Sequence, residues 1–213
     1  MAAIITEKFR THNAKQFKED FGESASSTYI FIGRSHAWPT VTSPPVPVNG
    51  TSEEMDSFDD MLSMKKAGSG DVSHCLPRYD WTLNTIYDEY AHDYSTGNTT
   101  PNGGSNLWGG KFYVMTDDYN VYKCIRTARN SAGAVVGSNV KPTGTSATSL
   151  IYTADVDASN NAYPQGYIWK YMYTVTAADT IKYVTSDFIP VKTLGAVAAV
   201  AGTGSNGTLG STA

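Results

Sequence analysis

The strongest secondary-structure signal in this chain is Tyr167-Ile168-Trp169-Lys170-Tyr171-Met172-Tyr173-Thr174-Val175. Successive side chains of a β-strand point to opposite faces of a sheet, so an alternating pattern of this kind is typical of a strand. One face is aromatic and carries Tyr167, Trp169, Tyr171 and Tyr173. Because each aromatic ring buries on the order of 150–250 Å², we predict that these four rings form the core of a small sheet domain. The other face, with Ile168, Lys170 and Met172, is expected to pack against a second sheet or a neighbouring subunit.

The composition indicates a protein that works in an assembly. Charged residues make up 17% of the 213 residues, and the chain contains 14 tyrosines. Soluble proteins average about 25% charged residues, and the cores of protein interfaces are poor in charge and rich in aromatics. We therefore expect partner proteins to cover much of the surface.

Several classes of partner are disfavoured by the sequence. The net charge of −4 is spread without a basic stripe, so no nucleic-acid partner is expected. The longest apolar run, residues 194–201, is far shorter than the roughly 20 residues that span a bilayer, so no membrane segment is expected. Two cysteines are too few for a disulfide framework, and no signal-peptide pattern opens the chain, which predicts a protein that is cytosolic when made.

Two helices are predicted in the first third of the chain. Thr11 is placed to cap a helix that ends at Gly22, and its narrow apolar stripe fits either a helix laid on a sheet or a docking helix for a partner. The second helix is expected to start with a capping box at 51–54 and to continue through Leu62, with Lys65 and Lys66 at its negative end, until Gly68.

The remaining elements are predicted to be short strands. Tyr29–Ile32 is apolar on both faces and is expected to be a buried strand. Two apolar runs that flank residues 117–120 predict a hairpin. Further strands are expected at 72–76, 150–152, 181–184 and 188–191.

The predicted fold is mainly β with a few short helices. A flexible joint at residues 68–71 suggests a boundary. The expected divisions are an N-terminal α+β domain at 1–71, a β domain at 72–192 and a low-complexity tail at 193–213.

No motif for catalysis, a cofactor or a metal is found. Around Gly110-Lys111 the P-loop pattern fails, because Ser105 stands at the position of the first glycine and Phe112 at that of the hydroxyl residue. Cys75 and Cys124 are interpreted as buried structural cysteines. The carboxylates Asp80, Asp88, Glu89 and Asp93 are interpreted mainly as turn formers. We expect no enzymatic activity and no small-molecule substrate.

A carbohydrate-binding β module is the alternative function. It is suggested by the tyrosine-rich loop from Tyr87 to Trp108, because exposed aromatic rings beside Asn and Asp loops stack on sugars. Most other aromatic residues lie in predicted strands, where a core or interface role is the default.

Two loops carry candidate interface anchors. The first contains Arg34 and Trp38, and the second contains Arg78, Asp80 and Trp81. Arg and Trp are enriched among the residues that dominate binding energy at interfaces. A structural role is the competing interpretation, in which the tryptophans cap the domain core and Arg78 with Asp80 braces its own turn.

Six motifs occur in an order and spacing that resemble the baseplate wedge subunits of contractile-tailed bacteriophages of the T-even and cyanophage type. They are Ile5-Thr6-Glu7-Lys8-Phe9-Arg10-Thr11, Ile30-Phe31-Ile32-Gly33-Arg34-Ser35, Pro77-Arg78-Tyr79-Asp80-Trp81, Val121-Tyr122-Lys123-Cys124-Ile125, Gly166-Tyr167-Ile168-Trp169-Lys170-Tyr171-Met172-Tyr173 and Phe188-Ile189-Pro190-Val191.

The resemblance implies a mainly β protein of two sheet-based domains, the second inserted after the first. It also implies a non-enzymatic virion protein of the tail baseplate, present in the host cytoplasm during assembly, that packs as a homodimer and joins neighbouring wedge subunits. The alternative carbohydrate-binding module would lie on a tail or surface protein. In that family a long segment after the Phe-Ile-Pro-Val motif helps to build the first domain. Here a Gly/Ala-rich tail follows that motif, so the first domain is expected to be incomplete.

Overall fold

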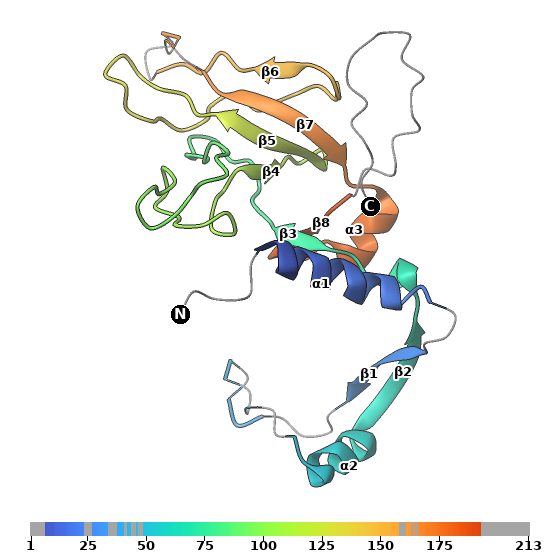
Figure 1. Ribbon diagram of the computed structural model, residues 1–213. Coiled ribbons are helices and arrows are strands. Elements are labelled where there is room, and N and C mark those ends of the chain that lie inside the picture. The colour runs from blue at the N-terminus through green and yellow to red at the C-terminus, as the bar shows by residue number, and fades with distance from the viewer. Residues whose placement is uncertain are drawn as a thin grey trace. The chain divides into compact units, whose positions relative to one another are not determined.

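A computed structural model of the protein describes residues 7–23, 27–33, 38–40, 42–43, 46, 49–157, 161–162, 164 and 166–192 (Figure 1). The described residues form eight strands, three α-helices and one short 3-10 helix, which confirms the predicted mainly β class. The chain divides into two compact units, Met1–Cys75 and Leu76–Ala213. The domain limits expected from the sequence, and the insertion of one domain after the other, stay predictions.

The first unit begins with helix α1 (Glu7–Asp20). Thr11 therefore lies inside the helix, and the prediction that it forms the N-cap is wrong. Lys8 and Arg10 are good helix formers, and they extend the helix by a turn before Thr11. The end of the helix lies close to the predicted glycine, since the Gly22 backbone N–H donates to Glu19 O at 2.8 Å.

Strands β1 (Thr28–Gly33) and β2 (Met61–Ala67) form an antiparallel two-stranded ribbon. Phe31 lies opposite Met64, and a register shift follows Ile32. The prediction that residues 29–32 form a buried strand is wrong, because Phe31 is 46% exposed and Ile32 is 67% exposed. A strand that is apolar on both faces is buried when other elements pack on both of its faces. Among the described residues, β1 pairs with β2 in a two-stranded ribbon, and its apolar side chains remain exposed.

Helix α2 (Thr51–Asp59) is shorter than predicted. Leu62, Lys65 and Lys66 lie in β2, where pairing with β1 satisfies the backbone and overrides the local helical pattern. The predicted capping box is also wrong: Gly50 is the N-cap and makes no side-chain capping bond. A short 3-10 helix, η1 (Ser69–Asp71), occupies the predicted joint.

The second unit contains a four-stranded antiparallel sheet with the strand order β4-β5-β7-β6. Its strands are β4 (Tyr113–Met115), β5 (Asn120–Arg126), β6 (Leu150–Tyr152) and β7 (Ile168–Thr174). The predicted hairpin is the β4–β5 pair, and Tyr119 in its turn has a positive φ of 58°. Strands β3 (Cys75–Pro77) and β8 (Phe188–Pro190) make a separate two-stranded sheet.

Helix α3 (Ala177–Tyr183) replaces the strand predicted at residues 181–184. The hydroxyl of Thr176 accepts a hydrogen bond from the Asp179 backbone N–H at 3.2 Å, so Thr176 caps the helix. Asp179 in the first turn also suits the positive end of the helix. These capping signals outweigh the short apolar pattern around Ile181, which is 87% exposed.

The core of the second unit consists of two clusters of buried side chains. The larger cluster contains Tyr87, Phe112, Val114, Tyr122, Cys124, Ala128, Tyr167 and Trp169. The smaller cluster contains Met115, Val121, Val175 and Ile189. Strand β7 therefore lies where the sequence placed it, at the centre of the packing.

The two cysteines differ in their environment. Cys124 is fully buried, as predicted, and burial raises the pKa of its thiol well above the ordinary value. Cys75 is exposed, so the prediction that it is buried is wrong. Cys75 opens a strand of three residues in a two-stranded sheet, where no second layer is required. None of the helices in the described residues is long and apolar enough to cross a membrane.

Candidate functional site

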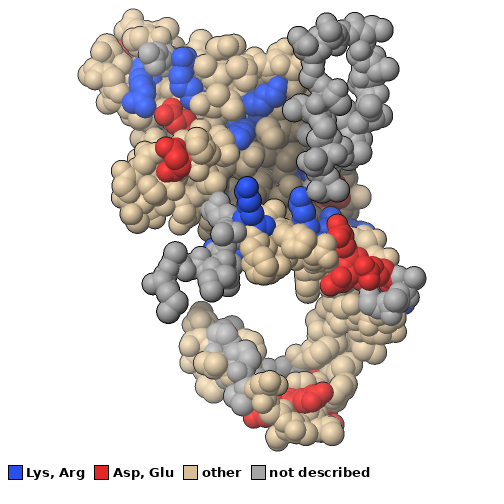
Figure 2. All heavy atoms as spheres, viewed as in Figure 1, with Lys and Arg blue, Asp and Glu red and all other residues tan. Residues whose placement is uncertain are grey.

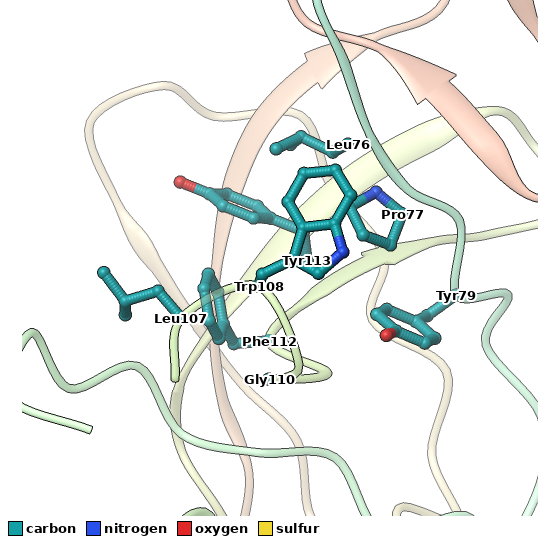
Figure 3. A pocket seen from close by; sticks show the side chains of 8 residues that line it. All are labelled: Leu76, Pro77, Tyr79, Leu107, Trp108, Gly110, Phe112 and Tyr113. Carbon is teal, nitrogen blue, oxygen red and sulfur yellow. The ribbon is translucent and has the colours of Figure 1, made fainter. Parts of the chain in front are cut away.

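The second unit contains an apolar pocket of about 180 Å³ (Figure 3). It is lined by Leu76, Pro77, Tyr79, Leu107, Trp108, Gly110, Phe112 and Tyr113. Trp108 is 62% exposed, which is unusual for so large an apolar side chain. The lining contains no carboxylate, histidine or thiol, so the pocket is suited to binding an apolar group rather than to reacting with one.

The loop that carries Trp108 is held by a buried carboxylate. Asp88 accepts hydrogen bonds from the backbone N–H of Asn102 at 3.0 Å and of Lys111 at 2.8 Å. Asn102 Nδ2 also donates to Asp88 at 2.9 Å. A Cβ at Gly110 would lie 2.8 Å from the Phe112 ring, so this turn needs a glycine. The interpretation of Asp88 as a turn-forming carboxylate is confirmed.

Two lysines lie against tyrosines of the pocket wall. Lys111 Nζ is 6.0 Å from the centroid of the Tyr79 ring. Lys123 Nζ is 5.7 Å from the centroid of Tyr113 and 3.2 Å from that of Tyr90. Desolvation lowers the pKa of Lys123, and burial raises the pKa of Tyr113. The Nζ atoms of both lysines lie near tyrosines of the wall, so two basic side chains border the apolar pocket.

The predicted anchors of the second loop have contacts within the chain. Arg78 Nε donates to Asp80 at 2.9 Å, and its Nη1 donates to Thr185 O at 2.9 Å. The hydrogen bond with Asp80 raises the pKa of Arg78. The Arg78 backbone N–H also donates to Asp187 O at 2.8 Å. Arg78 therefore ties the loop to the segment that precedes β8.

Trp81 is partly buried against the larger core cluster. Its indole Nε1 donates to Ser138 Oγ at 3.1 Å, and its backbone N–H donates to Met115 O at 2.7 Å. These contacts support the capping interpretation for Trp81. In the first loop, Arg34 lies outside the described residues, and Trp38 is 36% exposed. An interface role for these anchors stays a prediction.

The aromatic face of β7 is divided between the two core clusters. Tyr167 and Trp169 are fully buried in the larger cluster. Tyr171 is partly buried and packs edge-on against Tyr122, with 5.9 Å between ring centroids. Tyr173 packs against the smaller cluster, and its hydroxyl donates to Pro190 O at 2.7 Å. Burial raises the pKa of Tyr167 far above its ordinary value.

The tyrosine-rich loop uses much of its aromatic surface inside the protein. Tyr87 is 1% exposed, and its hydroxyl donates to Asp80 O at 3.0 Å. The Tyr94 hydroxyl donates to Glu89 O, and burial raises its pKa to about 12. The Tyr87 ring is therefore not available for stacking on a sugar. Trp108 is the more exposed aromatic group of this loop.

Sequence reasoning missed a second buried carboxylate. Asp155 is fully buried and accepts hydrogen bonds from Thr153 Oγ1 at 2.6 Å, from the Asn139 backbone N–H at 2.9 Å and from the Tyr167 backbone N–H at 3.0 Å. It joins the loop before β7 to the loop before β6. The residues that flank Asp155 in the sequence are typical of a polar loop, so no local pattern predicted that this carboxylate is buried. In the described part of the chain, no cluster of three or more His, Cys, Asp or Glu side chains is arranged to hold a metal ion.

Comparison with known proteins shows the family to which this chain belongs. The model of the family Phage-Gp8, described as Bacteriophage T4, Gp8, matches residues 3–199. The baseplate wedge protein gp8 of Enterobacteria phage T4 is 23% identical over 210 residues, which cover 89% of this chain. The chain spans about 60% of the length of that relative. These matches confirm the resemblance inferred from the six motifs, and the chain belongs to the Gp8 family of phage baseplate wedge proteins.

Proposed function

We propose that this protein is a structural component of a phage tail baseplate wedge in the virion. It joins neighbouring wedge subunits through protein–protein contacts during assembly, it packs as a homodimer, and it works without catalysis. Family membership supports the baseplate role, because the T4 relative is named as a baseplate wedge protein.

The observation that carries the proposal is the apolar surface of the first unit. Eight large apolar side chains of β1, α2 and β2 are each between 46% and 71% exposed: Tyr29, Ile30, Phe31, Ile32, Met55, Phe58, Leu62 and Met64. On the ribbon, the exposed side chains of Phe31 and Met64 lie opposite each other. Contiguous exposed apolar groups mark interaction sites.

The ribbon also needs cover for its stability. An isolated two-stranded hairpin is marginally stable in water, and packing against another layer is what makes it persist. In the register of β1 and β2, Phe31 and Met64 lie side by side on one face, while Ile30 and Ile32 lie on the other. Partner contacts on this ribbon would bury apolar groups at about 25 cal/mol per Å² removed from water.

The alternative of a carbohydrate-binding module rests on Trp108. Its exposed ring offers a stacking surface beside the pocket. The pocket lining is otherwise mainly apolar, whereas sugar sites need several polar partners for the hydroxyl groups. The wedge role is therefore the better-supported function.

Co-purification tests the proposed function. The full chain is co-expressed with the other baseplate wedge proteins of the same phage, and tagged complexes are isolated and identified by mass spectrometry. A stoichiometric complex with at least one wedge protein is expected. Recovery of the chain alone, in repeated trials with a folded sample, would contradict a wedge-joining role.

A further inference from the structure

Two features of this chain have complementary shape and charge. The first is helix α2 in the first unit, and the second is the apolar pocket of the second unit, which we call the Trp108 pocket and define by its eight lining residues given above. Helix α2 has no buried residue. Trp108 is mostly exposed, although the pocket beside it shares Phe112 with the larger core cluster.

Helix α2 presents an apolar pair between carboxylates. Met55 and Phe58 are three residues apart and therefore lie on one face of the helix, and they are 62% and 63% exposed. Asp59 follows Met55 by four residues, and Glu54 precedes Phe58 by four, so an acid borders each apolar side chain. The helix contains no basic residue. Figure 2 shows acidic side chains gathered at this helix.

The Trp108 pocket offers the matching features. Its volume of about 180 Å³ is sufficient for one phenyl ring, since a cavity of about 150 Å³ binds benzene in a well-studied protein. The ammonium groups of Lys111 and Lys123 lie against Tyr79 and Tyr113 of its wall. An apolar side chain that enters the pocket beside a carboxylate would therefore meet both an aromatic wall and a cation.

We propose that α2 of one copy docks on the Trp108 pocket of a second copy, with Phe58 in the pocket, Met55 against its wall, and Glu54 and Asp59 paired with Lys111 and Lys123. This inference rests on the proposed homodimer and names its contact surfaces. Charge complementarity selects this occupant: α2 carries four acids and no base, whereas α1 mixes acidic and basic residues. In a two-fold symmetric dimer the same contact occurs twice.

Zero-length carbodiimide cross-linking tests the contact without any substitution. This reagent joins a carboxylate to an ammonium group only when the two groups touch. An equal mixture of ¹⁴N-labelled and ¹⁵N-labelled chains is allowed to exchange, cross-linked and digested. Peptides of mixed isotope that join the 51–60 segment to Lys111 or Lys123 are expected. The proposal would be overturned if cross-links between these segments were found without any peptides of mixed isotope, because such links form within one chain. It would also be overturned if α2 were linked only to other lysines.

Sedimentation equilibrium supplies the quantitative test. Phe58→Ser is expected to raise the dimer dissociation constant by about tenfold or more, as for a central interface anchor. Phe17→Ser is the matched control, since Phe17 is equally exposed at 63% but lies on α1. Circular dichroism checks that both variants fold. Equal dissociation constants for Phe58→Ser and the wild type would overturn the proposal.

Reversing the charges on both proposed surfaces separates the contribution of the ion pairs from that of the apolar contact. The variant Lys111→Glu with Lys123→Glu is expected to self-associate at least about tenfold more weakly, and mixing it with Glu54→Lys plus Asp59→Lys is expected to restore association. No weakening by the first variant would overturn the proposed pairing. A chain that stays monomeric yet co-purifies with wedge proteins would overturn this inference alone, whereas a chain with neither behaviour would overturn the proposed function as well.

Discussion

The rings of Tyr167 and Trp169 stack with 5.3 Å between their centroids and 15° between their planes. Tyr167 immediately precedes β7, and Trp169 is the second residue of that strand, so the extended chain places both rings on one side, and both are fully buried. The Tyr167 hydroxyl donates to Val136 O at 2.8 Å, and Tyr87 packs edge-on against both rings. This stack is the centre of the larger core cluster.

Truncation of the stack should strongly destabilise the second unit. Trp169→Ala removes the largest fully buried side chain, and we expect it to lower the free energy of unfolding by about 3 to 5 kcal/mol. Urea denaturation followed by circular dichroism measures the change. Trp108→Ala is the control and should cost less than about 1 kcal/mol, because that side chain is mostly exposed. Equal costs for the two variants would contradict the assignment of the core.

The buried carboxylate of Asp155 should be nearly as important as the rings. Asp155→Ala leaves the buried backbone N–H groups of Asn139 and Tyr167 without their acceptor. We expect a loss of about 2 to 4 kcal/mol in the free energy of unfolding. Asp118→Ala, which removes an exposed partner of Lys141, is the control and should change it by less than about 1 kcal/mol. A neutral Asp155→Ala variant would show that the hydrogen bonds are not needed.

The two thiols should react at very different rates. Cys75 is exposed, whereas Cys124 is buried and its thiol has a strongly raised pKa. Because the thiolate is the nucleophile, we expect one equivalent of iodoacetamide to be consumed by the native protein at pH 8, and two in denaturant. Peptide mapping should locate the native adduct on Cys75. Rapid native labelling of Cys124 would contradict its burial.

Alkaline pH should weaken the fold. Folding raises the pKa of Cys124 above 9.0 and the pKa of Tyr87 and Tyr167 above 10.0. Above these ordinary values the unfolded chain releases protons that the folded chain retains, so the free energy of unfolding falls as pH rises. Urea midpoints measured from pH 8 to 11 should decrease, and Tyr167→Phe should show a shallower decrease above pH 10. A midpoint that is constant over this range would contradict the prediction.

Sugar binding should be absent. The loop tyrosines Tyr87 and Tyr94 hydrogen-bond within the protein, and the pocket beside Trp108 is apolar. We expect no signal on a glycan array. We also expect no change in intrinsic tryptophan fluorescence when the protein is titrated with oligosaccharides of the kinds that the array displays. Saturable quenching that Trp108→Ala abolishes would favour the carbohydrate-binding alternative.

Sequence patterns predicted the second unit better than the first. The period-two alternation of β7 and the hairpin around residues 117–120 are local signals, and both elements form where they were expected. Leu62 and Lys65 had an equally good helical pattern but lie in β2, because pairing with β1 is a long-range interaction that local propensity does not report. The prediction that β1 is buried was wrong for a related reason. The apolar pattern of β1 indicates that its side chains favour burial, but it does not identify which element or partner would bury them.

The pocket was harder to predict than the strands. Its walls come from residues 76–79 and 107–113. The Met115 backbone N–H donates to Tyr79 O at 2.8 Å and joins the first segment to β4, while Asp88 holds the second segment through Lys111. No sequence period marks such a site. By contrast, Arg78, Asp80 and Trp81 stood out as a motif, and their contacts brace the loop and the core within the chain.

Sedimentation velocity of the purified chain, alone and mixed with the other wedge proteins of its phage, tests the central claim most directly. The apolar side chains exposed on β1, α2 and β2 predict that the chain sediments as a dimer or moves in a complex with a wedge protein. A folded, monodisperse monomer that binds none of the tail proteins would contradict the structural wedge role.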